Sequence, residues 1–304
     1  MTLKSNNLKH DYHYKTGPTG TVNQNKGRDI SVVTHDGLFH SDEVFSIALL
    51  KLFHKNINIV RTRDSEILKE AVDNPEIYVL DTGKVYNPQQ LNFDHHQDKM
   101  PKELSTISIL FYHLFPDYPI DEVMIKLYHR LVSGINTWDQ GKIDRNTEDI
   151  PLYLPQIISA FNRYGTSEQD HQFIKAIEFA EQIIANEMNT AKELIKAEEI
   201  WNNRTILGKE TVILDQHCVF WPIVQGQNTK IKYIIQPSGK NWSVVSVDSV
   251  KHPLPPAPDD LDPIFEHKDR FIIIFKQLSS AMQYAYNQLE ITNTESLTLN
   301  YTEK

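Results

Sequence analysis

The chain has 304 residues, 40% of them hydrophobic, and a formal net charge of −9. This acidic balance argues against a broad basic surface for long duplex DNA, because such a surface needs many Lys and Arg side chains to neutralise phosphates. It leaves room for a local basic pocket that binds a short anionic substrate. Cys218 is the only cysteine, so an intrachain disulfide is excluded and the chain fits a reducing compartment.

No apolar run is long enough to span a bilayer, and residues 1–7 lack the apolar core of a secretory signal. We therefore expect a cytoplasmic protein without a membrane partner. The length suits two domains. The pattern along the chain predicts a flexible N-terminal tail at 1–28, an α/β domain at 29–150, a helical connector at 151–205, a smaller α+β domain at 206–291 and a polar tail at 292–304.

A strand–helix rhythm begins after the N-terminal tail. It predicts strands at 30–33, 57–60 and 77–80, and helices at 44–53 and at 65–72, the second capped by Ser65. This alternation implies a mainly parallel sheet with right-handed crossovers and helices on both faces. The carboxyl ends of parallel strands meet at one edge, which is where open α/β sheets bind ligands.

The rest of the chain divides into a helical part and a mixed part. Apolar spacing predicts helices at 105–115, 121–135 and 167–203, then strands at 211–214, 231–236, 242–247 and 271–275, and a last helix at 279–290. Gly141 is expected to terminate the helix that precedes it. Asp139 would then lie at a helix end, free to point into a site.

Imidazoles and carboxylates gather at the predicted sheet edge. The candidate metal ligands are His35, His40, Asp42, Asp81, His95 and Asp139. A mixture of nitrogen and oxygen donors suits Mn²⁺, Zn²⁺, Fe²⁺ or Co²⁺ better than Ca²⁺, which prefers oxygen. Six ligands exceed what one catalytic ion uses, so we expect two ions, about 4 Å apart, that share a bridging carboxylate. Asp81, at the end of the central strand, is the best candidate for that bridge.

Each cluster also has an ordinary structural explanation. Asp81 at a strand end can act as a helix cap, and residues 94–96 can form a capped turn with histidines in solvent. The combination is more informative, because the strand pattern independently brings three of the clusters to the same edge.

The order of these clusters resembles the DHH phosphoesterase superfamily. Within it, residues 34–43, 60–64 and 93–97 are similar to the melanocyte-proliferating-gene family, whose members are also known as uncharacterised metal-dependent hydrolases. Weaker similarity follows at 138–141, 236–238 and 265–272. The resemblance extends from about residue 30 to residue 290.

This resemblance implies a fold, a chemistry and a set of roles. The 29–150 domain would be DHH-like, and the chain a binuclear, Mn²⁺-dependent hydrolase of phosphoesters, with eukaryotic relatives associated with 3′-to-5′ RNA exonuclease activity. Carried over by residue, His35, His40 and Asp81 would hold one ion, while Asp42, His95, Asp139 and again Asp81 would hold the other. An aspartate is usual in the superfamily at the position of His40, so a histidine there lowers the negative charge of the site by one.

The catalytic and substrate-binding residues follow from the same resemblance and from side-chain chemistry. His96 would face the substrate phosphate, and Asp94 would orient a histidine. Arg61 and Arg63 are suited to clamp phosphate, with surface ion pairs to Asp64 and Glu66 as the alternative.

The second domain contributes less to the prediction. His267 is the candidate contact there, with a structural histidine as the alternative. The superfamily's glycine-rich substrate segment has no counterpart at 271–276.

We therefore expect a phosphodiesterase or 3′-to-5′ exonuclease for RNA or short oligonucleotides, with its site in a cleft between the two domains and a hydroxide activated by two metal ions. A small-molecule phosphatase or pyrophosphatase is the second interpretation, favoured by the acidic charge and the missing glycines. A metal-stabilised regulatory or binding module without turnover is the third. The sequence leaves the oligomeric state open, a homodimer included.

Overall fold

The computed structural model describes residues 27–97, 103–143, 152–226 and 230–289. Nearly all of the predicted N-terminal tail and the whole of the predicted C-terminal tail lie outside these ranges. The chain forms two compact units, Met1–Ala191 and Lys192–Lys304. Among the described residues, no helix combines the length and the hydropathy needed to cross a bilayer.

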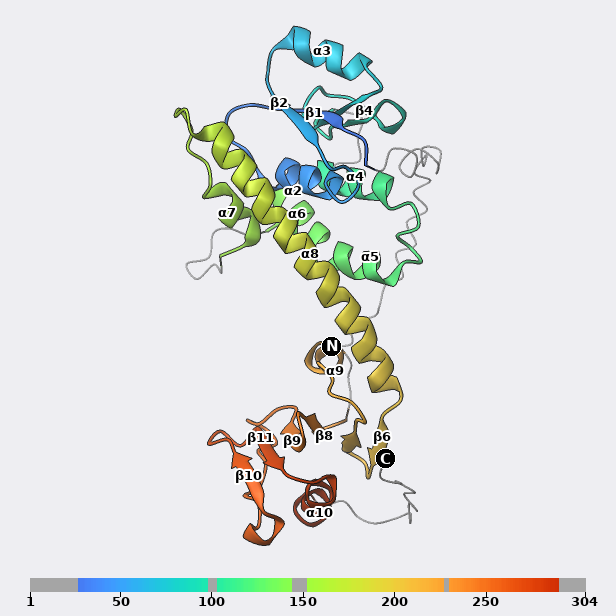
Figure 1. Cartoon of the computed structure of the whole chain (residues 1–304), viewed down its shortest axis with the longest axis vertical. Coiled ribbons are helices and arrows are strands. Elements are labelled where there is room, and N and C mark those ends of the chain that lie inside the picture. Colours follow the sequence, from blue (N-terminus) through green and yellow to red (C-terminus); the bar gives the residue numbers. More distant parts are fainter. Residues whose placement is uncertain (1–26, 98–102, 144–151, 227–229, 290–304) are drawn as a thin grey trace. The chain divides into compact units, whose positions relative to one another are not determined.

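The first unit is built on a five-stranded sheet with the order β2-β1-β3-β5-β4 (Figure 1). The first four of these pair in parallel, and β4 closes the edge antiparallel to β5. Their bounds are β1 Ile30–Thr34, β2 Ile57–Arg61, β3 Ile77–Leu80, β4 Tyr86–Asn87 and β5 Asn92–Phe93. The predicted mainly parallel sheet is confirmed. The two-residue strands β4 and β5 were not predicted, because so short a run carries no alternation pattern.

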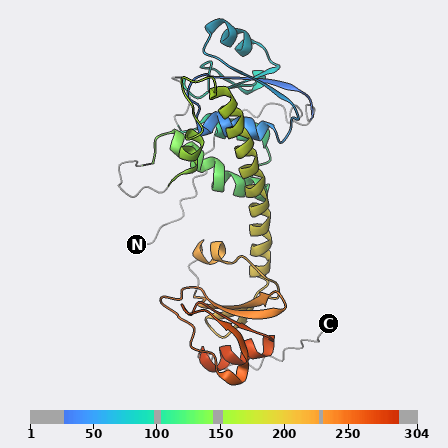
Figure 2. The same ribbon diagram turned by 60° about the vertical axis from the view of Figure 1, so that its left-hand side comes forward.

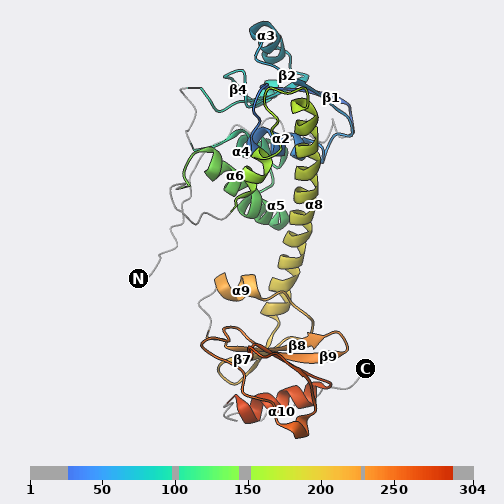
Figure 3. The same ribbon diagram turned by 90° about the vertical axis from the view of Figure 1, so that its left-hand side faces the viewer.

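Helices cover both faces of this sheet, as predicted. On one side lie α2 (Ser41–Leu50) and α4 (Thr106–Leu114), and their apolar residues share a core with the strands. On the other side lies α3 (Ser65–Asp73), which packs over β1 and β3 and is seen above the sheet in Figure 3. All ten residues of α2 are buried, which explains the continuous apolar run of its sequence.

A helical segment follows α4 and carries one irregularity. It consists of α5 (Glu122–Leu127), a π-helical turn η2 (Tyr128–Val132) and α6 (Ser133–Asp139). The predicted single helix is thus longer than expected and contains a π turn. Gly141 has a φ of 64°, and its N–H bonds to the carbonyl of Trp138, so the predicted terminating turn is present. A short helix, α7 (Leu154–Ser159), comes next.

The long helix α8 (Gln169–Asn202) is continuous over 34 residues (Figure 2). Its spacing of three and four is reflected in burial, because Phe173, Ile177, Ala180 and Ile184 belong to the core of the first unit. Its last turns supply Ala197, Ile200 and Trp201 to a core of the second unit.

The second unit is α+β, as predicted. Its sheet has the order β10-β11-β9-β8-β7-β6, with β7–β8 as the parallel pair. The bounds are β6 Thr205–Leu207, β7 Thr211–Ile213, β8 Tyr233–Ser238, β9 Asn241–Ser246, β10 Pro263–Glu266 and β11 Ile272–Phe275. Helix α10 (Leu278–Gln288) covers one face (Figure 3), and α9 (Trp221–Gly226) packs with the core that includes β7 and β8. The prediction missed β6, β10 and α9, which are short; β10 also begins at a proline.

Candidate metal centre

The loop between β1 and α2 places the first donors. His35 follows β1 and is 5% exposed. Its Nε2 lies 3.0 Å from Oε1 of Glu43 and 3.5 Å from Oδ2 of Asp81. His40 is the N-cap of α2, and its backbone N–H donates to the same Oε1 of Glu43 at 2.8 Å. The start of the helix thereby fixes Glu43 beside His35.

Side chains from the α7–α8 region hold this loop in shape. Asn162 exchanges two hydrogen bonds with the backbone of Phe39, at 3.0 and 2.9 Å. The carbonyl of Gly37 accepts from Nε2 of Gln169 at 2.8 Å and from Nη2 of Arg61 at 2.6 Å. Distant residues therefore fix the position of both loop histidines.

Asp81 lies between two histidines. It follows β3 and is 6% exposed. Its Oδ2 faces Nε2 of His35 at 3.5 Å, and its Oδ1 faces Nε2 of His95 at 3.3 Å. Oδ1 also accepts a hydrogen bond from Oγ1 of Thr106 at 3.2 Å. The two oxygens of one carboxylate are thus directed to two different donor groups, which is the geometry of a bridge.

The backbone that presents Asp81 is unusual. Asp81 has a φ of 53°, which a non-glycine residue seldom adopts. Gly83, with a φ of 85°, follows two residues later, and a Cβ there would lie 2.9 Å from Cγ2 of Val72. Only glycine fits this turn, which reverses the chain directly after Asp81.

The second donor group is assembled from three elements. Nε2 of His95, just after β5, lies 3.4 Å from Oδ2 of Asp139 at the end of α6. It lies 3.9 Å from Oδ2 of Asp42 in α2. The fully buried Asp42 accepts from the backbone N–H groups of Thr106 and Ile107 at 2.8 and 2.9 Å. The N-terminus of α4 thus provides donors for this carboxylate that the helix itself leaves unpaired.

The pKa values of the three carboxylates reflect how closely their negative charges are packed. Burial, followed by the neighbouring Asp139 and Asp81, raises the pKa of Asp42 well above its usual value. Burial also raises the pKa of Asp139. Burial alone would raise the pKa of Asp81, but the adjacent imidazoles of His35 and His95 outweigh it and lower the pKa.

The two histidines respond in the opposite sense. Burial opposes their charge, but the adjacent Asp81 carboxylate prevails, so the pKa of His35 rises to about 10 and that of His95 to about 9. Protons on these histidines offset the negative charge of the carboxylates. The cluster is therefore arranged to hold added positive charge.

Several donor atoms are buried without a hydrogen-bond partner. Within the described residues, these include Nε2 of His95, Oδ2 of Asp139 and Oε2 of Glu43. Such atoms cost stability unless something binds them. Donor atoms lie within 4.8 Å of one another in three groups, His35–His40–Glu43–Asp81, Asp81–His95–His96 and Asp42–His95–Asp139. The orphaned atoms and the mixed nitrogen and oxygen donors fit divalent transition-metal ions.

His96 is oriented by Asp94. Oδ1 of Asp94 accepts from the backbone N–H of His96 at 2.9 Å and lies 2.8 Å from its Nδ1, while Oδ2 accepts from the N–H of Lys84 at 2.6 Å. The hydrogen bond with Asp94 raises the pKa of His96. Asp94 is 1% exposed, whereas the His96 side chain is 56% exposed. Asp94 therefore fixes the orientation of the exposed His96 ring.

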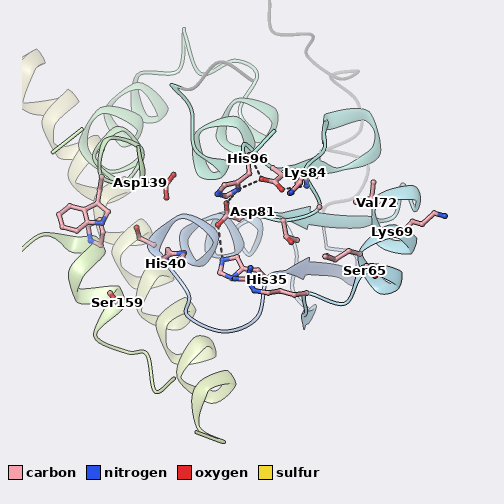
Figure 4. A pocket seen from close by; sticks show the side chains of 18 of the residues that line it. His35, His40, Ser65, Lys69, Val72, Asp81, Lys84, His96, Asp139 and Ser159 are labelled. Carbon is pink, nitrogen blue, oxygen red and sulfur yellow. Dashed lines mark hydrogen bonds and ion pairs between the residues drawn. The ribbon is translucent and has the colours of Figure 1, made fainter. Parts of the chain in front are cut away.

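A cavity of about 1100 Å³ opens over these groups (Figure 4). His35, His40, Asp81, His96 and Asp139 line its middle. The other lining residues are Ser41, Arg63, Ser65, Leu68, Lys69, Val72, Thr82, Gly83, Lys84, Asp94, Trp138, Pro155, Gln156 and Ser159. All of them belong to the first unit.

The model of MYG1_exonuc, an uncharacterised protein family (UPF0160), matches residues 31–254. The chain belongs to this family. The family resemblance predicted from the sequence motifs is thereby confirmed, and the matched range contains every donor described above.

Individual relatives match the chain at moderate identity. A MYG1 protein of Dictyostelium discoideum is 27% identical over 264 residues, covering 72% of this chain and 78% of that protein. A MYG1 exonuclease of Rattus norvegicus is 28% identical over 191 residues, covering 51% of this chain and 49% of that protein. The match thus spans about half the length of the rat protein. Among solved structures, RecJ from Thermus thermophilus in complex with Mn²⁺ aligns with 87% of this chain and 52% of that chain, at 11% identity and a TM-score of 0.26.

Of the two arginines singled out in the MYG1-like motifs, only Arg63 lines the cavity. Its Nη2 lies 3.3 Å from Nδ1 of His35, and its Nε lies 3.0 Å from Oδ1 of Asp36. The guanidinium of Arg61 is turned elsewhere. It donates to Gly37 and to Asp170, and it lies 4.5 Å from the ring centroid of Phe173. The structure thus gives Arg61 a role in holding the loop and does not place it in the cavity.

The alternative ion pairs expected for these arginines do not form either among the residues that the structure describes. Asp64 accepts instead from the N–H groups of Glu66 and Ile67 and is the N-cap of α3. This corrects the prediction that Ser65 is the cap. Ser65 is the first helical residue, because the aspartate before it already provides the acceptor.

His267 belongs to the second unit and does not line this cavity. Its Nδ1 accepts from the N–H of Asp269 at 3.1 Å, and its ring centroid lies 4.2 Å from that of Phe271. Local contacts in the turn between β10 and β11 account for its position. Its contact with substrate stays a prediction.

Two residues of the site were not singled out from the sequence. Glu43 contacts His35, and Thr106 contacts both Asp81 and Asp42. A signal for Glu43 was available, since an acid three residues after a helix cap is the capping-box pattern. No local signal points to Thr106, which acts through the packing of α4.

Proposed function

We propose that this chain is a metal-dependent phosphodiesterase that removes nucleotides from the 3′ end of RNA or short oligonucleotides with the help of two divalent ions. The observation that carries the proposal is the placement of the Asp81 carboxylate, with one oxygen toward His35 and the other toward His95. The rat and mouse relatives are named MYG1 exonuclease, which supports the nucleic-acid substrate.

The donor groups divide between the two ions. His35, His40 and Glu43 would hold one ion, while Asp42, His95 and Asp139 would hold the other, with Asp81 shared. The donor set favours Mn²⁺, with Zn²⁺, Fe²⁺ or Co²⁺ as the other fits. A bound pair of ions supplies activation of water and neutralisation of charge on the phosphoryl group.

The chain's own residues bind and orient the substrate. Arg63, Lys69 and Lys84 line one side of the cavity and attract the anionic substrate. Nδ1 of His96 is engaged by Asp94, so Nε2 is the atom that donates to a phosphate oxygen. Burial of Asp42 and Asp81 keeps water away from the reacting centre on that side. These positive groups lie in the cavity of a chain whose net charge is −9, which fits a short substrate better than long duplex DNA.

A second candidate is hydrolysis of a small phosphoester or of pyrophosphate. It is favoured by the fact that residues of the first unit alone line a cavity large enough for a nucleotide. The comparison that separates the two candidates is turnover of an RNA oligonucleotide against turnover of a monomeric phosphoester.

The test combines a substrate panel with elemental analysis. We expect the protein with Mn²⁺ to shorten RNA from its 3′ end, and the wild type to bind about two ions per chain. Asp81→Asn should remove both properties, while Asp260→Asn, at an exposed acid in the second unit, should keep both. The proposal is wrong if RNA, dinucleotide, phosphomonoester and pyrophosphate all remain intact and Asp81→Asn leaves the metal content unchanged.

A further inference from the structure

The two ends of the cavity differ in chemistry. Toward α3 and the turn after β3 it carries the cations Arg63, Lys69 and Lys84. Toward α6 and α7 it carries Trp138, Pro155, Gln156 and Ser159, none of which is charged. Figure 4 shows Lys84 and Lys69 on one side, Ser159 on the other, and Asp81 with His35 between them. An elongated ligand with one anionic and one uncharged part would fit in one direction only.

Trp138 provides a flat surface at the uncharged end. It precedes Asp139 in α6 and is half-buried. The ring of Tyr153, which is the N-cap of α7, packs against the indole with centroids 5.5 Å apart at an angle of 47°. Tyr153 is absent from the cavity lining, so it supports the indole from outside the cavity. A tryptophan held in this way is a suitable platform for a planar ring.

Gln156 adds a hydrogen-bond donor with a fixed orientation. Its Oε1 accepts from the backbone N–H of Tyr153 at 2.9 Å, which determines where the amide nitrogen lies. Its Nε2 has no acceptor among the residues that the structure describes, and Gln156 itself lines the cavity. Ser159 lies three residues further along α7, hence on the same helix face, and adds a hydroxyl.

We propose that this wall of Trp138, Gln156 and Ser159 is a nucleobase subsite, which rests on the function proposed above. The base stacks on the indole, and its polar edge meets Nε2 of Gln156 and the Ser159 hydroxyl. Its phosphate then points toward Asp81 and the cations beyond. A nucleotide joins a planar aromatic ring to an anion in this order, whereas pyrophosphate and sugar phosphates have no part for such a wall. Stacking tolerates every base, so the subsite favours nucleotides over other phosphoesters without strong sequence preference.

The first test is equilibrium binding, which does not depend on turnover. Adenosine 5′-monophosphate and ribose 5-phosphate differ only in the base. With Mn²⁺ present, we expect the wild type to bind the nucleotide about tenfold more tightly, as stacking of one base on an aromatic side chain provides. Trp138→Leu should abolish this difference and leave ribose 5-phosphate binding unchanged. Trp138→Phe keeps an aromatic face and should retain most of it.

Controls separate stacking from general damage. Trp221→Leu makes the same change at an exposed tryptophan that does not line the cavity, and it should behave as the wild type. Gln156→Glu keeps the acceptor for Tyr153 and removes the donor, so it should weaken nucleotide binding more than ribose 5-phosphate binding. If Trp138→Leu fails to fold, the Trp138→Phe and Gln156→Glu variants carry the test.

Turnover provides the second test. For a dinucleotide, Trp138→Leu should raise KM about tenfold with kcat little changed, and it should not affect an abasic analogue. The inference is overturned if the wild type binds both monophosphates equally, or if Trp138→Leu weakens both by the same factor. Absence of hydrolysis of every phosphoester would instead contradict the proposed function, and the binding comparison would still decide the subsite.

Discussion

The two donor groups of the candidate metal centre are built in different ways. The loop group, His35, His40 and Glu43, comes from nine consecutive residues around the start of α2. The packed group, Asp42, His95 and Asp139, comes from α2, from the segment after β5 and from the end of α6. The first depends on the shape of one loop, and the second on how several elements pack. A substitution in one group should therefore change metal content and activity differently from a substitution in the other. Only Asp81 belongs to both groups.

The largest effect is expected from Asp81→Asn, which breaks both groups at once. The amide cannot provide two anionic oxygens to His35 and His95. We expect activity to fall about a thousandfold, equivalent to roughly 4 kcal/mol of transition-state stabilisation. Both ions should be lost, as measured by elemental analysis alongside kcat/KM. Retention of one tightly bound ion would show that the groups are independent.

Asp139→Asn should damage the packed group alone. It removes the charge from an oxygen that lies 3.4 Å from Nε2 of His95, while the loop group stays intact. We expect about one ion fewer and a loss of activity of about a hundredfold, or roughly 3 kcal/mol. Asp117→Asn, at an exposed acid in the same unit, is the matched control. Unchanged metal stoichiometry in Asp139→Asn would remove this residue from the ligand set.

Asn162→Ala should damage the loop group from a distance. It removes both hydrogen bonds to Phe39 and so loosens the loop between His35 and His40. We expect activity to fall about tenfold. The free energy of unfolding should fall by about 3 kcal/mol, since the contacts of Asn162 with Ser159 and Gln169 are lost together with the two to Phe39. Asn87→Ala, which removes an exposed side-chain contact to Gln90, is the control for denaturant unfolding and for kcat. Equal effects of the two variants would show that the hydrogen bonds of Asn162 do not hold the loop in place.

The smallest predicted effect is a pH dependence of stability caused by His113, which packs near the packed group. Burial lowers the pKa of His113 to about 4, and its ring lies 5.0 Å from that of Phe93, two residues before His95. A histidine with a lowered folded-state pKa is neutral when folded, so its protonation in the unfolded chain destabilises the fold as pH falls from about 6.5 toward 4.

The measurement is the difference in unfolding free energy between the wild type and His113→Leu across that window. We expect the wild type to lose about 1 kcal/mol more than the variant between pH 6 and pH 5, and the two curves to run parallel above pH 7.5. Parallel curves throughout would show that His113 does not titrate in this way.

The difference between the loop group and the packed group also explains which site residues the sequence could predict. The loop motif and Asp81 were predictable, because a strand pattern locates the carboxyl edge and polar residues directly after strands gather there. Asp139 was placed at a helix end from a glycine, and the structure brings it to His95. Local patterns sufficed wherever the donor follows a strand or a helix directly.

Other features depend on contacts that no local pattern contains. Arg61 follows the motif as well as Arg63 does, yet packing against Phe173 turns it away from the cavity. The N–H groups of Thr106 and Ile107 reach Asp42 across more than sixty residues of sequence. These roles come from the assembly of elements, and therefore only a three-dimensional arrangement reveals them.

The π-helical turn η2 affects the direction of α6 through the number of residues it contains, whatever those residues are. A π turn holds one residue more than the α-helical turn it replaces, and one residue in an α-helix corresponds to a rotation of about 100°. The insertion at Tyr128–Val132 therefore sets the direction in which α6 presents Asp139. Removing one residue from this turn would leave every motif intact and turn Asp139 away from His95. In this chain, the length of the segment between motifs therefore matters to the candidate metal centre as well as the motifs themselves.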